Sequence, residues 1–162
     1  MRCAMRLAGF RDAISEAGLP PESGVAELGQ PSQTTHGADA LRRLLNASDP
    51  PTAIATGTVQ MTIGVLAAAH QDQLSVPRNL SIVGFGDEPG FSWWGPGLTT
   101  VALPVHKLAT ACGVWLLHRV EMTAADPTPA ARFVSASPGT LVVRGSTAAP
   151  AGASRRARAG QR

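Results

Sequence analysis

The stretch SIVGFGDEPGFSWWGPGLTTV, residues 81–101, carries the strongest indication of the fold class. Its first residues are apolar and predict a buried β-strand. The chain then becomes rich in glycine, proline and tryptophan, and the stretch ends on a Thr-Thr pair. Because α/β proteins hold ligands in the loops that follow buried strands, this loop is a candidate binding element. The alternative is that it only turns the chain.

Helical and strand-like segments alternate on both sides of this stretch. Apolar residues recur with helical spacing near the N-terminus, at Cys3, Leu7, Phe10, Ile14 and Ala17. Gly18 is well placed to end that helix. The remaining segments predict strands at 25–28, 52–56, 80–85 and 140–146, and helices at 38–46, 59–71 and 105–120. This alternation predicts an α/β fold with a mostly parallel sheet and right-handed crossovers.

Composition fits one globular domain. The chain has 162 residues, 44% of them hydrophobic, and a mean hydropathy of +0.05. No apolar run reaches membrane-spanning length, and the N-terminus is amphipathic, unlike a signal peptide, so we expect a cytoplasmic protein without a membrane partner. Cys3 and Cys112 are expected to be buried thiols, since two distant cysteines make a poor disulfide or metal site.

The basic charge is concentrated at one end of the chain. The last fourteen residues, 149–162, hold four arginines and no acid, so the rest of the chain has 10 basic and 11 acidic residues. Residues 149–162 are rich in alanine, glycine and proline, and we expect a disordered, solvated tail. The alternative is a weak contact with phosphates.

No catalytic constellation is apparent. The sequence lacks G-x-S-x-G, H-E-x-x-H, a Walker A loop and G-x-G-x-x-G, and its four histidines are scattered. The GFGDEPG run follows a strand but lacks the helix opening that a dinucleotide site requires. We therefore expect neither an enzyme nor a cofactor.

Three positions are candidates for binding a small molecule. Thr58, after the 52–56 strand, is a helix N-cap in the simpler interpretation and a ligand contact in the other. Gly86 and Asp87 follow the 80–85 strand, where a carboxylate can accept hydroxyl hydrogen bonds or serve as a turn residue. Arg6 lies on the first helix, where an arginine alone is usually solvent-facing.

Trp93 and Trp94 permit two interpretations. Their rings could stack on a sugar or anchor a protein interface. Two adjacent residues of an extended backbone point in opposite directions, so both rings cannot enter one cleft. The interface interpretation is therefore preferred.

Four blocks of this sequence resemble the LacI/GalR family of bacterial transcription regulators. They are RLAGFRDAISEAGL (6–19), PTAIATGTVQMTIGVLAAAHQDQLSVPRNLSIVGFGDEP (51–89), LTTVALPVHKLA (98–109) and TLVVRGSTAAP (140–150). The family has an N-terminal helix-turn-helix and two α/β lobes with an effector between them. The resemblance implies an incomplete three-layer sandwich of the periplasmic-binding-protein-like type. Residues 1–103 and 128–148 would form the C-terminal lobe, and 104–127 a crossover helix of the other lobe.

The resemblance assigns the binding positions incompletely. Arg6 matches the family's arginine, but Thr58-Val59 stands where the family commonly has Asn-Asp, and Gly86-Asp87 where it has two acids. An aromatic residue of the family is replaced near Ser32. Two polar contacts and one stacking surface are therefore altered. The family's dimer contacts would correspond to the helix containing Met61 and to the loop containing Trp93 and Trp94.

These expectations combine into an effector-binding and dimerisation module of a LacI-type regulator, truncated and weak in effector binding. The effector would be a sugar or a related molecule, and DNA would be bound only through a helix-turn-helix outside this chain. The partner would be a second copy or a full-length regulator. The alternatives are an interaction-only fragment that pairs with a full-length regulator, and a periplasmic sugar-binding protein.

Overall fold

The computed structural model describes residues 2–29, 33–125 and 134–150. The helices are α1 (Arg2–Glu16), α2 (Thr34–Leu45), α3 (Val59–Gln71) and α4 (Val105–Ala125), with short 3-10 turns η1 (Pro21–Ser23) and η2 (Pro89–Ser92). The strands are β1 (Ala53–Ala55), β2 (Ser81–Phe85), β3 (Thr99–Ala102) and β4 (Thr140–Val142). They form one sheet in the order β1-β2-β3-β4, in which only the β3–β4 pair is antiparallel. The predicted α/β fold with a mostly parallel sheet is confirmed.

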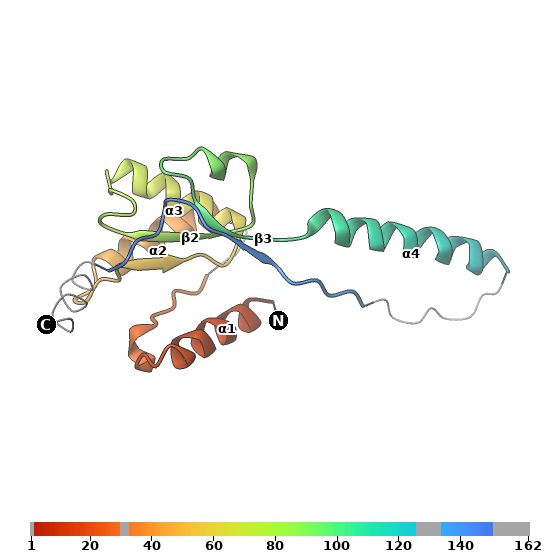
Figure 1. Ribbon diagram of the computed structural model, residues 1–162, viewed down its shortest axis with the longest axis horizontal. Coiled ribbons are helices and arrows are strands. Elements are labelled where there is room, and N and C mark those ends of the chain that lie inside the picture. Colours follow the sequence, from red (N-terminus) through yellow and green to blue (C-terminus); the bar gives the residue numbers. More distant parts are fainter. Residues whose placement is uncertain (1, 30–32, 126–133, 151–162) are drawn as a thin grey trace, which may run out of the picture.

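The hydrophobic core lies on one face of this sheet. Its buried residues come from α2, α3, β2, the residue before β2 and the loop between β2 and β3: Leu41, Val65, Leu66, Ala68, Ala69, Leu80, Ile82, Phe91 and Leu98. Side chains alternate along a strand, so Ile82 and Gly84 face α3 while Val83 and Phe85 face the other way. Figure 1 shows α1 on that other side, which makes three layers.

Two glycines let α2 and α3 pack closely. A Cβ built at Gly64 would overlap the Thr34 carbonyl oxygen, and one at Gly37 would overlap the Met61 carbonyl oxygen. Both glycines are buried, and the helices therefore pack with backbone against backbone. This helix pair covers one face of the sheet.

The predicted strand at 25–28 is wrong. The structure has no strand there, and Val25 and Leu28 are 67% and 69% exposed. A strand needs a partner, and residues 25–28 do not pair with β1, whose only partner among the described strands is β2: Thr52 accepts from Ser81 and Thr56 donates to Val83, both at 3.0 Å. The intervening Ala53 and Ala55 direct their backbone groups to an outer edge that no described strand occupies, and their side chains are exposed rather than buried as predicted.

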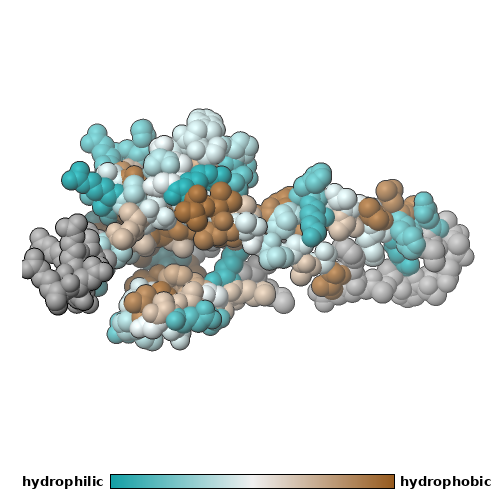
Figure 2. Space-filling view, viewed as in Figure 1, coloured by the Kyte–Doolittle hydropathy of each residue, from teal (hydrophilic) through white to brown (hydrophobic). Residues whose placement is uncertain are grey.

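Helix α4 extends away from the rest of the molecule (Figure 1). Among the described residues it packs against no other helix or strand. Figure 2 shows apolar side chains on the surface of this arm, where Val114, Leu117 and Val120 are 63%, 70% and 71% exposed. Cys112, predicted to be buried, is exposed for the same reason. The Cys3 side chain and the predicted tail from residue 151 onward lie outside the described residues.

Candidate functional site at the strand ends

The carboxyl ends of β1 and β2 lie side by side because the two strands are parallel neighbours. Thr58 follows β1 and is the N-cap of α3: its Oγ1 accepts a hydrogen bond from the Met61 backbone N–H at 3.1 Å. The capping role is confirmed. A ligand contact by Thr58 stays a prediction.

Arg6 is directed toward these strand ends and not into solvent. Its Nη1 donates to the Gly57 carbonyl oxygen at 2.6 Å. The centre of its guanidinium group lies 4.0 Å from the ring centroid of Phe85, a cation–π contact. The structure therefore brings Arg6 of α1, Gly57 after β1 and Phe85 of β2 together. Phe85 was not identified as a site residue from the sequence, because a phenylalanine in a predicted buried strand is normally interpreted as a core residue.

Position 86 requires glycine because the Val59 side chain leaves no room for a Cβ there. The φ of Gly86 is +82°, a backbone conformation that favours glycine, and a Cβ there would lie 2.5 Å from Val59 Cγ2. Val59, the residue after Thr58, and Gly86 thus pack against each other, and neither carries a polar side chain. This corner contributes no carboxylate.

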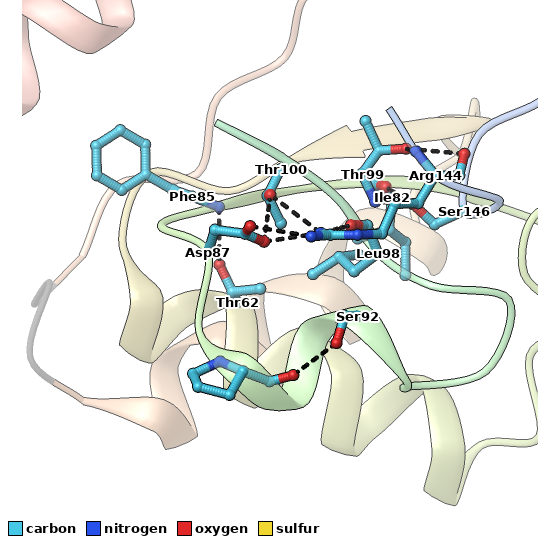
Figure 3. Close-up of polar contacts among 11 residues, drawn as sticks. Thr62, Ile82, Phe85, Asp87, Ser92, Leu98, Thr99, Thr100, Arg144 and Ser146 are labelled. Atoms are coloured by element: carbon cyan, nitrogen blue, oxygen red, sulfur yellow. Dashed lines mark hydrogen bonds and ion pairs between the residues drawn. The ribbon is translucent and has the colours of Figure 1, made fainter. Parts of the chain in front are cut away.

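Asp87 is bound to Arg144 (Figure 3). Arg144 Nη1 donates to Oδ1 at 2.7 Å, Nη2 donates to Oδ2 at 2.9 Å, and Thr100 Oγ1 donates to Oδ1 at 2.8 Å. The hydrogen bond from Arg144 lowers the pKa of Asp87, desolvation opposes it, and the pKa of Arg144 is raised in turn by its hydrogen bond to Asp87. Both carboxylate oxygens therefore have partners within the protein.

Asp87 and Arg6 do not converge. A Cβ on Gly84 would approach Thr100 and Thr62, which places Thr100 and the Asp87 carboxylate beside it on the α3 face of the sheet. Phe85 and Arg6 lie on the opposite face. Effector binding by Asp87 stays a prediction, and it would have to compete with the bidentate pair.

A polar network connects Arg144 and Ser146, which follow β4, with Thr99 of β3 and Ile82 of β2. The Thr99 hydroxyl accepts from the Arg144 N–H at 2.9 Å and donates to the Arg144 carbonyl oxygen at 3.1 Å. The fully buried Ser146 hydroxyl accepts from the Thr99 N–H and donates to the Ile82 carbonyl oxygen, at 2.8 and 2.6 Å. We did not predict roles for Arg144, Thr100 or Ser146, although the Thr-Thr pair and the R-G-S sequence were visible.

The two tryptophans occupy different environments. Trp93 is 79% exposed. Trp94 is partly buried against the core cluster. The two rings therefore lie in different environments, although Trp93 has φ −116° and ψ 4° and not the extended backbone assumed from the sequence. Met61, the other predicted interface residue, is partly buried on α3.

The described residues contain no group of three or more His, Cys, Asp or Glu side chains that could hold a metal ion. None of the helices they form is long and apolar enough to cross a membrane.

Comparison with known proteins gives a consistent result. A model of the periplasmic binding protein-like domain matches residues 4–147. The chain is 37% identical over 149 residues to the HTH-type transcriptional regulator MalR of Streptomyces coelicolor, covering 91% of this chain and 42% of that protein. It is 34% identical over 116 residues to the ribose operon repressor of Escherichia coli, covering 72% of this chain and 35% of the repressor.

A solved structure agrees with these matches. A putative LacI-family regulator from Sanguibacter keddieii superposes with a TM-score of 0.75 at 29% identity, over 90% of this chain and 54% of that one. The chain thus spans about half of this solved structure and 35–42% of the two curated relatives.

Proposed function

Because this chain belongs to the periplasmic-binding-protein-like family, in its branch of LacI-type transcription regulators, we propose that it is the effector-binding and dimerisation module of such a regulator. The observation that carries the proposal is the convergence of Arg6, Gly57 and Phe85 at the carboxyl ends of β1 and β2. Ligands of open α/β sheets bind at this edge. The module binds rather than catalyses, and it acts in the cytoplasm, where such regulators meet DNA.

The effector site has an unusual balance of groups. Arg6 supplies hydrogen-bond donors and Phe85 an aromatic face, while Gly86 and Val59 provide no side-chain acceptor. Sugars are held by acceptors as well as donors, so the loss of a carboxylate weakens sugar binding.

Calorimetric titration with D-ribose, the sugar in the name of the E. coli relative, tests this. We expect a dissociation constant weaker than about 1 µM, and any heat of binding should vanish in Arg6→Ala. Arg11→Ala, an exposed arginine on the same helix, is the matched control and should leave the titration unchanged. A dissociation constant below 1 µM would contradict the weak site, and binding that survives Arg6→Ala would contradict its location.

The domain boundaries follow the same proposal. Residues 1–103 and 128–148 form one lobe, and 104–127 cross to a second lobe supplied by polypeptide that the longer relatives carry. The support is the isolation of α4: it packs on no described element and exposes Val114, Leu117 and Val120. An apolar helix surface of this kind needs a covering partner.

Self-association is proposed to use Trp93, together with Met61 and the part of Trp94 that the core leaves uncovered. A tryptophan that is 79% exposed on a short loop is a costly surface residue unless a partner buries it. Trp93→Ala should weaken self-association about tenfold or more in sedimentation equilibrium, without loss of stability. Trp94 is left intact because it packs on the core.

The matched control for Trp93→Ala is Val25→Ala. Val25 is another large exposed apolar residue, outside the proposed interface. Equal self-association in Trp93→Ala and the unchanged protein would refute this interface.

A second candidate is an interaction-only fragment that pairs with a full-length regulator. The packing of Val59 against Gly86 favours it, because that packing fills a corner of the binding site while Trp93 stays exposed. Co-purification with a full-length LacI-type regulator, lost in Trp93→Ala, would support this candidate. The calorimetric titration would then show no binding.

A further inference from the structure

The loop from Gly86 to Leu98 carries Trp93 and has its own internal order. Backbone hydrogen bonds join Phe91 to Glu88 at 2.9 Å, Trp94 to Gly90 at 3.1 Å and Leu98 to Phe91 at 2.8 Å. Phe91 and Leu98 are buried in the core cluster. The loop is therefore a folded unit, and the placement of Trp93 depends on how the two ends of that unit are fixed.

A single side chain ties both ends together (Figure 3). Arg144 binds Asp87 at the start of the loop through two hydrogen bonds and the Leu98 carbonyl oxygen at its end through a third, at 2.7 Å. The next residue, Gly145, donates to the Pro96 carbonyl oxygen at 3.2 Å. Gly97, at φ +80°, has no side chain, and a Cβ there would lie 3.2 Å from Arg144 Cδ.

Arg144 belongs to the segment that returns from α4. β3 leads into α4, and β4 brings the chain back along β3 in antiparallel register, with Arg144 two residues beyond its end. Thr99 holds the Arg144 backbone through its hydroxyl at both the N–H and the carbonyl. We call the contacts of Arg144 with Asp87, the Leu98 carbonyl and Thr99 the clasp. The clasp joins three parts of the chain: the loop, β3 and the segment that returns from α4.

We propose that Arg144 is a positioning residue for Trp93, and that it makes self-association depend on the placement of the segment that follows β4. This rests on the proposed role of Trp93. Only arginine fits, since its planar fork serves two carboxylate oxygens and a carbonyl at once, whereas lysine offers a single point of charge. Asp87 in this arrangement is an anchor of the loop.

Hydrogen exchange measured by mass spectrometry tests the clasp directly. In Arg144→Met, peptides from the loop, residues 86–98, should exchange about tenfold faster, while peptides from α2 and α3 keep their protection. Arg42→Met is the matched control. It breaks another bidentate pair, to Asp72, whose side chains are more exposed, 41% and 37% against 21% and 27% in the clasp. It should leave the loop unchanged.

A double-mutant cycle tests whether the clasp acts through Trp93. Arg144→Met should weaken self-association about tenfold in the unchanged protein and less than twofold in the Trp93→Ala background. Arg144→Lys should restore only part of the association. If the Arg144→Met protein fails to fold, Asp87→Asn takes its place in both experiments, because it removes the carboxylate charge and keeps the shape of the side chain.

The outcomes separate the two proposals. Unchanged loop exchange in the clasp variant overturns the positioning role. Equal effects of Arg144→Met with and without Trp93 overturn the connection to the interface. If the unchanged protein does not self-associate, the proposed interface fails, and hydrogen exchange alone then decides the clasp.

Discussion

Replacing Gly64 with alanine is expected to lower the free energy of unfolding by about 3 kcal/mol, because the added methyl group enters a fully packed contact between two helices. A Cβ at this position overlaps the Thr34 carbonyl oxygen and lies 2.9 Å from the Thr34 carbonyl carbon and 3.1 Å from the Ala38 nitrogen. All three are backbone atoms of α2, so no side chain can rotate away. The helices must separate, and the core cluster beneath them opens. Urea denaturation followed by circular dichroism measures the loss.

Gly9→Ala is the control for this substitution. Gly9 lies in the middle of α1, and a Cβ there meets nothing within 4 Å. The same chemical change should therefore stabilise the protein by up to about 1 kcal/mol through helix propensity alone. A Gly64→Ala protein as stable as the unchanged one would mean that α2 and α3 are farther apart than the structure has them.

Sequence periodicity was sufficient to predict the helices, because a helix carries its own local pattern. The helices α1, α2, α3 and α4 each begin within a few residues of the predicted start, because an apolar stripe or an N-cap such as Thr58 is a local signal. A strand cannot be predicted from its own residues alone, because it forms only beside a neighbouring strand. Residues 25–28 have a strand-like composition, yet they do not pair with the outer edge of β1, which no described strand occupies, and Val25 and Leu28 stay exposed. Composition alone cannot supply the neighbour that a strand requires.

The candidate site divides in the same way. Thr58, Gly86 and Asp87 could be placed at the strand ends because each lies within three residues of the end of a strand. The partners that decide their chemistry are distant: Arg144 is 57 residues from Asp87, and Gly57 is 51 residues from Arg6. Only the three-dimensional structure puts Arg144 beside Asp87. A carboxylate that looked available for a ligand therefore proved to be paired.

Ser146→Ala should destabilise the fold by about 3 kcal/mol, because it leaves two buried backbone groups without partners. The Ser146 hydroxyl accepts from the Thr99 N–H at 2.8 Å and donates to the Ile82 carbonyl oxygen at 2.6 Å, and the residue is 0% exposed. It thus bridges β2 and the first residue of β3. Alanine removes the bridge and leaves no polar group in its place.

Ser92→Ala removes the same atom from an exposed position. The Ser92 hydroxyl donates to the Pro89 carbonyl oxygen at 2.8 Å in the loop that bears Trp93. Water can replace that bond, so the expected change in unfolding free energy is below about 0.5 kcal/mol. The difference between the two variants, measured by urea denaturation, is the cost of burying unpaired groups. A difference near zero would show that the pairing of β2 with β3 does not depend on the Ser146 hydroxyl, and that backbone contacts such as the Ile82 N–H to the Ser146 carbonyl oxygen, at 2.9 Å, hold the return segment instead.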